Sequence, residues 1–172
     1  KKNTILLALF IVYSSVNILN AQSKKLYSDL ILSLPFCGNA NNVSQYTLST
    51  TVFGAILSSD RFGNSNSAYY FDSTSYIEIQ DDNIFNMKEF TINIWINPDY
   101  SDRVMHLIGK SNLNNAYNEQ FQMAINFPSN GFNLNVKPES ECNQINRWER
   151  SFINTTLSAY NWYMLTGVFS KN

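Results

Sequence analysis

Residues 60–80 read DRFGNSNSAYYFDSTSYIEIQ, and this stretch decides the fold that the sequence predicts. Its first part, Asp60–Ser67, consists largely of Asp, Asn, Ser and Gly, the residues that favour tight turns. Its middle, Ala68–Phe71, is a short aromatic strand. Its last part, Ser75–Gln80, places Ile77 and Ile79 on one face and polar groups on the other, which is the period of a half-buried strand. Short strands joined by polar turns predict an antiparallel, β-rich domain.

The same alternation recurs along the chain on both sides of this stretch. In the clearest example, residues 90–96, isoleucines and Phe90 share one face, while Trp95 lies on the other with Thr91 and Asn93. Predicted strands cover Leu30–Phe36, part of Thr47–Leu57, Phe90–Ile96, Val104–Lys110, Phe121–Asn126, Phe132–Lys137 and Trp162–Phe169. A short helical turn is expected at Ile84–Met87. The pattern predicts an all-β protein, an antiparallel β-sandwich.

Three segments, in the same order along the chain, carry a family resemblance. They read LPFCGNAN at 34–41, DRFGNSNSAYYFDSTSYIEI at 60–79 and FTINIWINP at 90–98. In these segments the chain resembles bacterial laminin-G-like domains of the concanavalin A-like lectin/glucanase superfamily. The resemblance implies a jelly-roll sandwich over residues 30–172 with Trp95 in its interior. It also implies a C-terminally incomplete domain, because the family's later strands have no counterpart before Asn172.

The N-terminus has the features of a secretory signal peptide. Lys1 and Lys2 precede an apolar run over residues 5–16, and Ala21 supplies a small residue for cleavage. Residues 1–21 are therefore predicted to be removed, leaving a short polar lead at 22–29 and no membrane span in the mature chain. The expected location is secreted, extracellular or at the cell surface. Export permits a disulfide between Cys37 and Cys142, and the sequence leaves open whether the two meet.

Composition excludes several function classes. Charged residues make up 15% of the chain and the net charge is −1, without a Lys/Arg cluster that could neutralise phosphates, so no nucleic-acid partner is expected. The chain has a single histidine, His106, which offers neither a zinc cluster nor a nucleophilic triad. His106 is expected to be a core or edge residue.

Catalysis by the paired carboxylates of glycoside hydrolases is not supported by the sequence. That mechanism needs two acids a few ångströms apart across the scissile bond. The nearest candidates, Glu139 and Glu141, lie in a predicted loop without a third acid, and Glu78 is alone on its strand. The sequence therefore predicts a protein that is not an enzyme.

A calcium site is the most plausible metal centre, because loop oxygens gather around the 60–80 stretch and many laminin-G-like domains hold a calcium ion. Carboxylate and amide oxygens are the ligands that Ca²⁺ prefers. The candidates are Asp60, Asn64, Asp72, Asp81 and Asp82. The alternative is that these side chains only stabilise turns.

Exposed aromatics on loops are the candidate ligand-binding residues, since rings can stack on sugars. They are Trp148, Tyr117, Tyr100 and Tyr160. Trp148 stands between Arg147 and Glu149 in a long polar insertion at 137–152; the alternative is that it packs against the sheet.

The sequence thus predicts a secreted, non-catalytic binding or adhesion module for carbohydrate or for a cell-surface or matrix partner. Two other interpretations remain open. In the first, the chain is an accessory or catalytic part of a glycoside hydrolase of the same fold. In the second, it is a structural spacer in a large surface protein.

Overall fold

The computed structural model describes residues 28–99, 104–110, 120–126, 131–137, 149–155 and 157–170. The chain divides into two compact units, with the boundary between Asn86 and Met87. Every described strand pairs with an antiparallel neighbour. The predicted all-β, antiparallel class is therefore confirmed.

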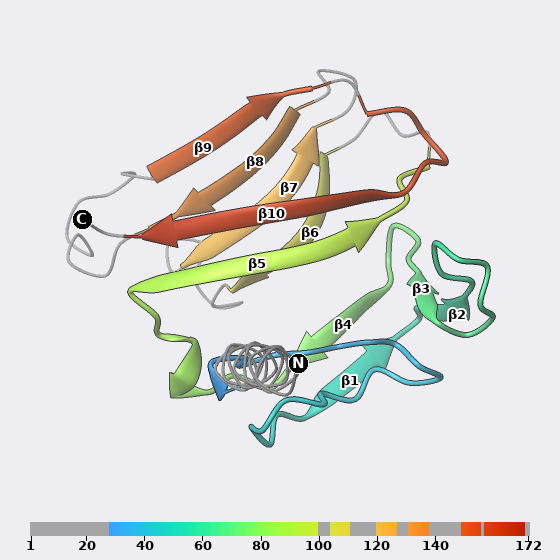
Figure 1. Ribbon diagram of the computed structural model, residues 1–172, viewed down its shortest axis with the longest axis horizontal. Helices are drawn as coiled ribbons and strands as arrows, with labels where there is room; N and C mark the ends of the chain where they lie inside the picture. Colours follow the sequence, from blue (N-terminus) through green and yellow to red (C-terminus); the bar gives the residue numbers. More distant parts are fainter. Residues whose placement is uncertain are drawn as a thin grey trace, which may run out of the picture. The chain divides into compact units, whose positions relative to one another are not determined.

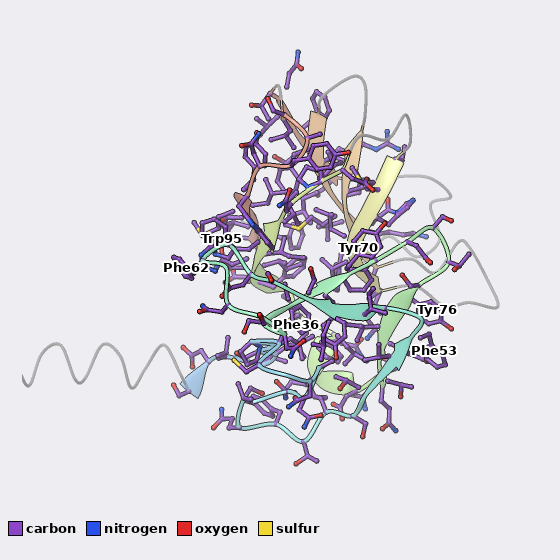
Figure 2. All side chains as sticks on the ribbon, turned by 90° about the vertical axis from the view of Figure 1, so that its right-hand side faces the viewer. Phe36, Phe53, Phe62, Tyr70, Tyr76 and Trp95 are labelled. Carbon is purple, nitrogen blue, oxygen red and sulfur yellow. The ribbon has the colours of Figure 1, made fainter. Side chains whose placement is uncertain are left out.

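The first unit contains two small antiparallel pairs. β1 (Thr50–Phe53) pairs with β4 (Tyr76–Ile79), and β2 (Ile56–Ser58) pairs with β3 (Ala68–Tyr70). Phe53 and Tyr76 lie opposite each other on β1 and β4, and their rings stack with centroids 4.7 Å apart (Figure 2). The predicted helical turn is a single 3₁₀ turn, η1 (Asn83–Phe85).

The predicted first strand at 30–36 is wrong, because these residues form no strand. The backbone N–H of Ser33 donates to Oδ1 of Asn42 at 2.9 Å. A second hydrogen bond comes from the same loop, since Oγ of Ser44 donates to the carbonyl of Ile31 at 2.6 Å. Phe36 has a φ of 58°, which no strand accommodates. Side chains thus take the backbone groups that a neighbouring strand would need.

The second unit holds two antiparallel sheets. β5 (Glu89–Ile96) pairs with β10 (Tyr163–Ser170) along its whole length. The other sheet has four strands in chain order, β6 (Val104–Lys110), β7 (Phe121–Asn126), β8 (Gly131–Val136) and β9 (Glu149–Asn154). Figure 1 shows these four strands side by side, with β5 and β10 crossing them. A register shift between His106 and Ile108 marks a bulge in β6.

One apolar core joins the two sheets of the second unit. Met123 and Ile125 on β7 are fully buried. The other buried members are Phe121, Phe132, Leu134, Val136, Leu157 and Leu165, and the isoleucines of β5 pack against them. Alternate residues of β5, β7, β8 and β10, with apolar residues of β6, point into this core, so the sheets pack face to face as in a β-sandwich.

Trp95 does not occupy the interior position that the family resemblance implied. Its side chain is 43% exposed, while Ile94 and Ile96 on either side pack against the core. The alternation in residues 90–96 had placed Trp95 on the opposite face from the isoleucines, and that assignment is confirmed. Phe71, at the end of the predicted aromatic strand, is 44% exposed.

Candidate functional site

The outward face of the four-stranded sheet carries polar side chains on most of its central positions. Because side chains alternate along a strand, the residues between the core positions of β7 and β8 point away from the core. The outward side chains are His106 on β6, Gln122 and Ala124 on β7, Asn133 and Asn135 on β8, and Arg150 and Phe152 on β9. Ala124 is buried and forms a floor between the longer side chains.

The register of the sheet arranges these residues in two neighbouring rows. One row runs from Gln122 through Asn135 to Arg150. The other runs from Ala124 through Asn133 to Phe152. Neighbouring strands lie about 4.8 Å apart, and residues two apart on one strand lie about 6.4–6.8 Å apart. Each row therefore crosses three strands, and the two rows together form a surface that combines amide groups, a guanidinium and an aromatic ring.

Hydrogen bonds fix the amide groups of the first row. Nε2 of Gln122 lies 2.6 Å from Nδ1 of His106, and Oε1 of Gln122 accepts from Nδ2 of Asn135 at 3.5 Å. Nδ2 of Asn135 also donates to Oδ1 of Asn133 at 3.2 Å. Within the described part of the chain, Oδ1 of Asn135 and Nδ2 of Asn133 make no hydrogen bond. An acceptor and a donor are thus left for a ligand, on side chains that the network holds in place.

Phe152 presents its ring beside these amides. The ring lies directly over Gly131 of β8, where a Cβ atom would overlap Cε2 and Cζ of Phe152. Phe152 is nevertheless 54% exposed. The absence of a side chain at Gly131 thus leaves room for the Cε2–Cζ edge of this ring, and more than half of the Phe152 side chain remains open to solvent.

Arg150 is the single charged side chain among the described residues that line this face. No hydrogen bond or ion pair of its guanidinium occurs within the described residues. Together these side chains border a shallow depression of about 360 Å³, which we call the β6–β9 groove. Its lining is Val104, Gln122, Ala124, Asn133, Asn135, Arg150 and Phe152.

The described lining of the β6–β9 groove offers several groups that can bind a ligand. Among the described residues that line it there is no carboxylate. It offers amide donors and acceptors, a guanidinium and an apolar ring within one small area. A ligand that has both hydroxyl groups and an apolar face would match this combination.

Asp60 and Asn64, two of the predicted calcium ligands, close the turn between β2 and β3. Oδ1 of Asp60 accepts from the backbone N–H groups of Phe62 and Asn64, each at 2.9 Å, and Oδ2 accepts from Nδ2 of Asn64 at 3.0 Å. The Asn64 side chain, and then the backbone N–H groups of Asn64 and Phe62, lower the pKa of the Asp60 carboxyl. Both oxygens of this carboxylate therefore serve the turn.

Asp72 and Asp82 act in the same way in their own turns. Oδ1 of Asp72 accepts from the backbone N–H and the hydroxyl of Thr74 and from the N–H of Ser75, and these bonds lower its pKa. Asp82 caps η1 by accepting from the N–H of Ile84. Across the described residues no three His, Cys, Asp or Glu side chains, Asp81 included, gather in a way that would hold a metal. Calcium binding stays a prediction.

Most of the predicted ligand-binding aromatics lie outside the described residues, namely Tyr100, Tyr117 and Trp148. Tyr160 is described and is 73% exposed. Its φ is 61°, and its backbone N–H donates to the carbonyl of Pro98 at 2.7 Å, so it sits in a tight turn before β10. Tyr160 does not belong to the described lining of the β6–β9 groove.

Cys37 is exposed and has a free thiol, and its predicted partner Cys142 lies outside the described residues, as do residues 1–21. The pairing and the signal peptide stay predictions. In the part of the chain that is described, no helix has the length and apolar character needed to cross a membrane.

The residues that make the groove were not among the predicted site residues. Arg150 and Phe152 fall at the end of the segment 137–152, which the sequence analysis assigned to a polar insertion. The segment ERSFIN at 149–154 forms β9 instead. The alternation of Arg150 and Phe152 with Ser151 and Ile153 was the feature of the sequence that could have predicted this strand.

Comparisons with known proteins add no relative to this chain. No protein-family model matches it, and neither a curated protein nor a solved structure is significantly similar. The functional assignment therefore rests on the residues and geometry described above.

Proposed function

We propose that this protein is a secreted, non-catalytic glycan-binding module whose ligand lies in the β6–β9 groove. The observation that carries the proposal is the exposed ring of Phe152, which lies beside Gly131 and next to a hydrogen-bonded amide row. A pyranose ring has a face of C–H groups and an edge of hydroxyls. The C–H face would stack on Phe152 while the hydroxyls would bond to Asn133 and Asn135.

The geometry favours sugars over purely apolar ligands. The amides of Asn133 and Asn135 are half-buried, so covering them with an apolar group would leave polar atoms without partners, at a cost of about 1–3 kcal/mol each. A hydroxyl both donates and accepts, and would satisfy both the free Nδ2 of Asn133 and the free Oδ1 of Asn135. The prior ordering of these side chains reduces the entropy lost on binding.

The proposal includes a fold relationship. We assign the chain to the laminin-G-like, concanavalin A-like jelly rolls on the three matching segments at 34–41, 60–79 and 90–98. The antiparallel sheets that pack face to face in the second unit are compatible with that assignment. The absence of a carboxylate in the described lining of the groove supports a binding role over hydrolysis.

Affinity electrophoresis of the secreted chain against a panel of soluble polysaccharides tests the proposal. Phe152→Ala should abolish the retardation that the wild-type protein shows on at least one polymer, because it removes the stacking surface. Ile153→Ala is the matched control, since Ile153 is 55% exposed on the same strand but points to the other face of the sheet. Both variants should keep the wild-type melting temperature within a few degrees.

Three outcomes would count against the proposal. Retardation that survives Phe152→Ala would place the glycan site elsewhere. No retardation on any polymer would favour the structural spacer. Release of reducing sugar from a polymer would favour the glycoside hydrolase.

A further inference from the structure

We infer that the β6–β9 groove selects glycans that carry carboxylate groups, such as polymers of uronic acids. This inference rests on the proposed glycan-binding function and specifies its ligand class. Its basis is Arg150, a charged residue whose partner is not supplied by the described part of the protein.

The charge balance of the groove favours an anion. Arg150 contributes one positive charge, the other polar side chains of the described lining are neutral amides, and that lining has no acid. The adjacent acid on the same strand, Glu149, points to the opposite face of the sheet, because neighbouring residues of a strand alternate. An anionic ligand would therefore be attracted by Arg150 and would meet no carboxylate among the described lining residues.

The spacing within β9 matches a uronic acid. Arg150 and Phe152 share one face and are two residues apart, about 6.4–6.8 Å along the strand. A hexuronate ring that stacks on Phe152 would project its carboxylate, which is attached outside the ring, toward the guanidinium. A guanidinium donates two parallel N–H groups to a carboxylate, so the pair would be bidentate.

The amide row provides the remaining contacts along the same ligand. Asn135 lies opposite Arg150 on β8, and Asn133 lies opposite Phe152. The hydroxyls of a stacked ring would reach Asn133, and those of the next ring would reach Asn135 and Gln122. Neutral sugars can use these contacts too, so the guanidinium is the group that would distinguish acidic from neutral polymers.

The test uses the full secreted chain and probes that differ only in charge. Polygalacturonate, alginate and hyaluronan are each compared with their carboxyl-reduced, neutral forms by affinity electrophoresis and by calorimetry on short fragments. We expect at least one uronate polymer to bind tenfold or more tightly than its reduced form, and Arg150→Gln to remove that difference. Arg150→Lys should keep only part of this difference in affinity, because an ammonium is a point charge and lacks the two parallel N–H donors of a guanidinium.

Arg61→Gln is the control for charge. Arg61 belongs to the other unit, and its guanidinium lies over the ring of Phe62 at 4.3 Å, so this variant removes the same charge from outside the groove. Arg61→Gln should bind the uronate polymer with an affinity within twofold of the wild-type value.

Equal affinity for the acidic and reduced polymers would overturn the inference while leaving glycan binding intact. So would an equal loss in Arg61→Gln and Arg150→Gln, or tighter binding of dextran sulfate with no dependence on Arg150. Wild-type affinity in Arg150→Lys would overturn the bidentate contact. Loss of all glycan binding in the wild-type protein would instead refute the proposed function itself.

Discussion

Gly167 on β10 tests whether the two sheets of the second unit share one core. A Cβ at this position would lie 2.9 Å from Cε of Met123 on β7 and 3.0 Å from Cδ2 of Leu134 on β8, closer than the 3.4–4 Å of ordinary contact. Gly167→Ala should therefore lower the free energy of unfolding by about 1–3 kcal/mol through overpacking. Met123→Ala alone should lower it by about 2–5 kcal/mol, because Met123 is fully buried.

The double variant distinguishes this packing from general destabilisation. Without the Met123 side chain, the methyl group added by Gly167→Ala would occupy part of the vacated space, so the double variant should be less destabilised than the sum by about 0.5–3 kcal/mol. Urea unfolding of all four proteins measures this coupling. Val168→Ala, a neighbour that is largely exposed, should change stability by less than about 0.5 kcal/mol. Additive effects within about 0.5 kcal/mol would mean that β7 and β10 do not face each other.

Further predictions concern the groove, the turns and the N-terminus. Gly131→Ala should displace the ring of Phe152 and reduce glycan retardation as Phe152→Ala does, with little change in melting temperature; unchanged retardation would refute the contact between ring and glycine. The pKa values of Asp60 and Asp72 are lowered in the folded state, so their contribution to stability is present above pH about 4 and is lost as the pH falls below it. Urea midpoints measured from pH 6 to pH 2 should fall less steeply in Asp72→Asn than in the wild-type protein, and equal slopes would contradict this. Mass spectrometry of the exported protein should find a mature N-terminus near Gln22, whereas an intact Lys1 on the exported chain would exclude cleavage.

Strand positions were predictable wherever hydrophobic and polar residues alternate. β5, β6, β7 and β8 lie where the alternation placed them, because a strand with one face on a core must alternate. The error at residues 30–36 has a different origin. The leucines there alternate, but Asn42 and Ser44, distant in sequence, bind the backbone of this segment in place of a strand.

The candidate site was harder to predict, because it depends on the pairing of strands far apart in sequence. Gln122, Asn135 and Arg150 become neighbours only through the register of β7, β8 and β9. Patterns within short segments of sequence instead favoured loop aromatics as ligand-binding residues and loop acids as calcium ligands. For Asp60 and Asp72 the alternative interpretation, turn geometry, accounts for the observed hydrogen bonds.

Occupation of the β6–β9 groove is tested most directly by NMR titration of the labelled protein with a short fragment of whichever polymer binds most tightly in the panel. The side-chain NH₂ signals of Gln122, Asn133 and Asn135 should shift in proportion to ligand occupancy. The signals of Asn93 and Thr166, on the outer face of the β5–β10 sheet, should stay in place. Shifts at Asn93 and Thr166 with unmoved signals from the three groove amides would contradict the assignment of the site.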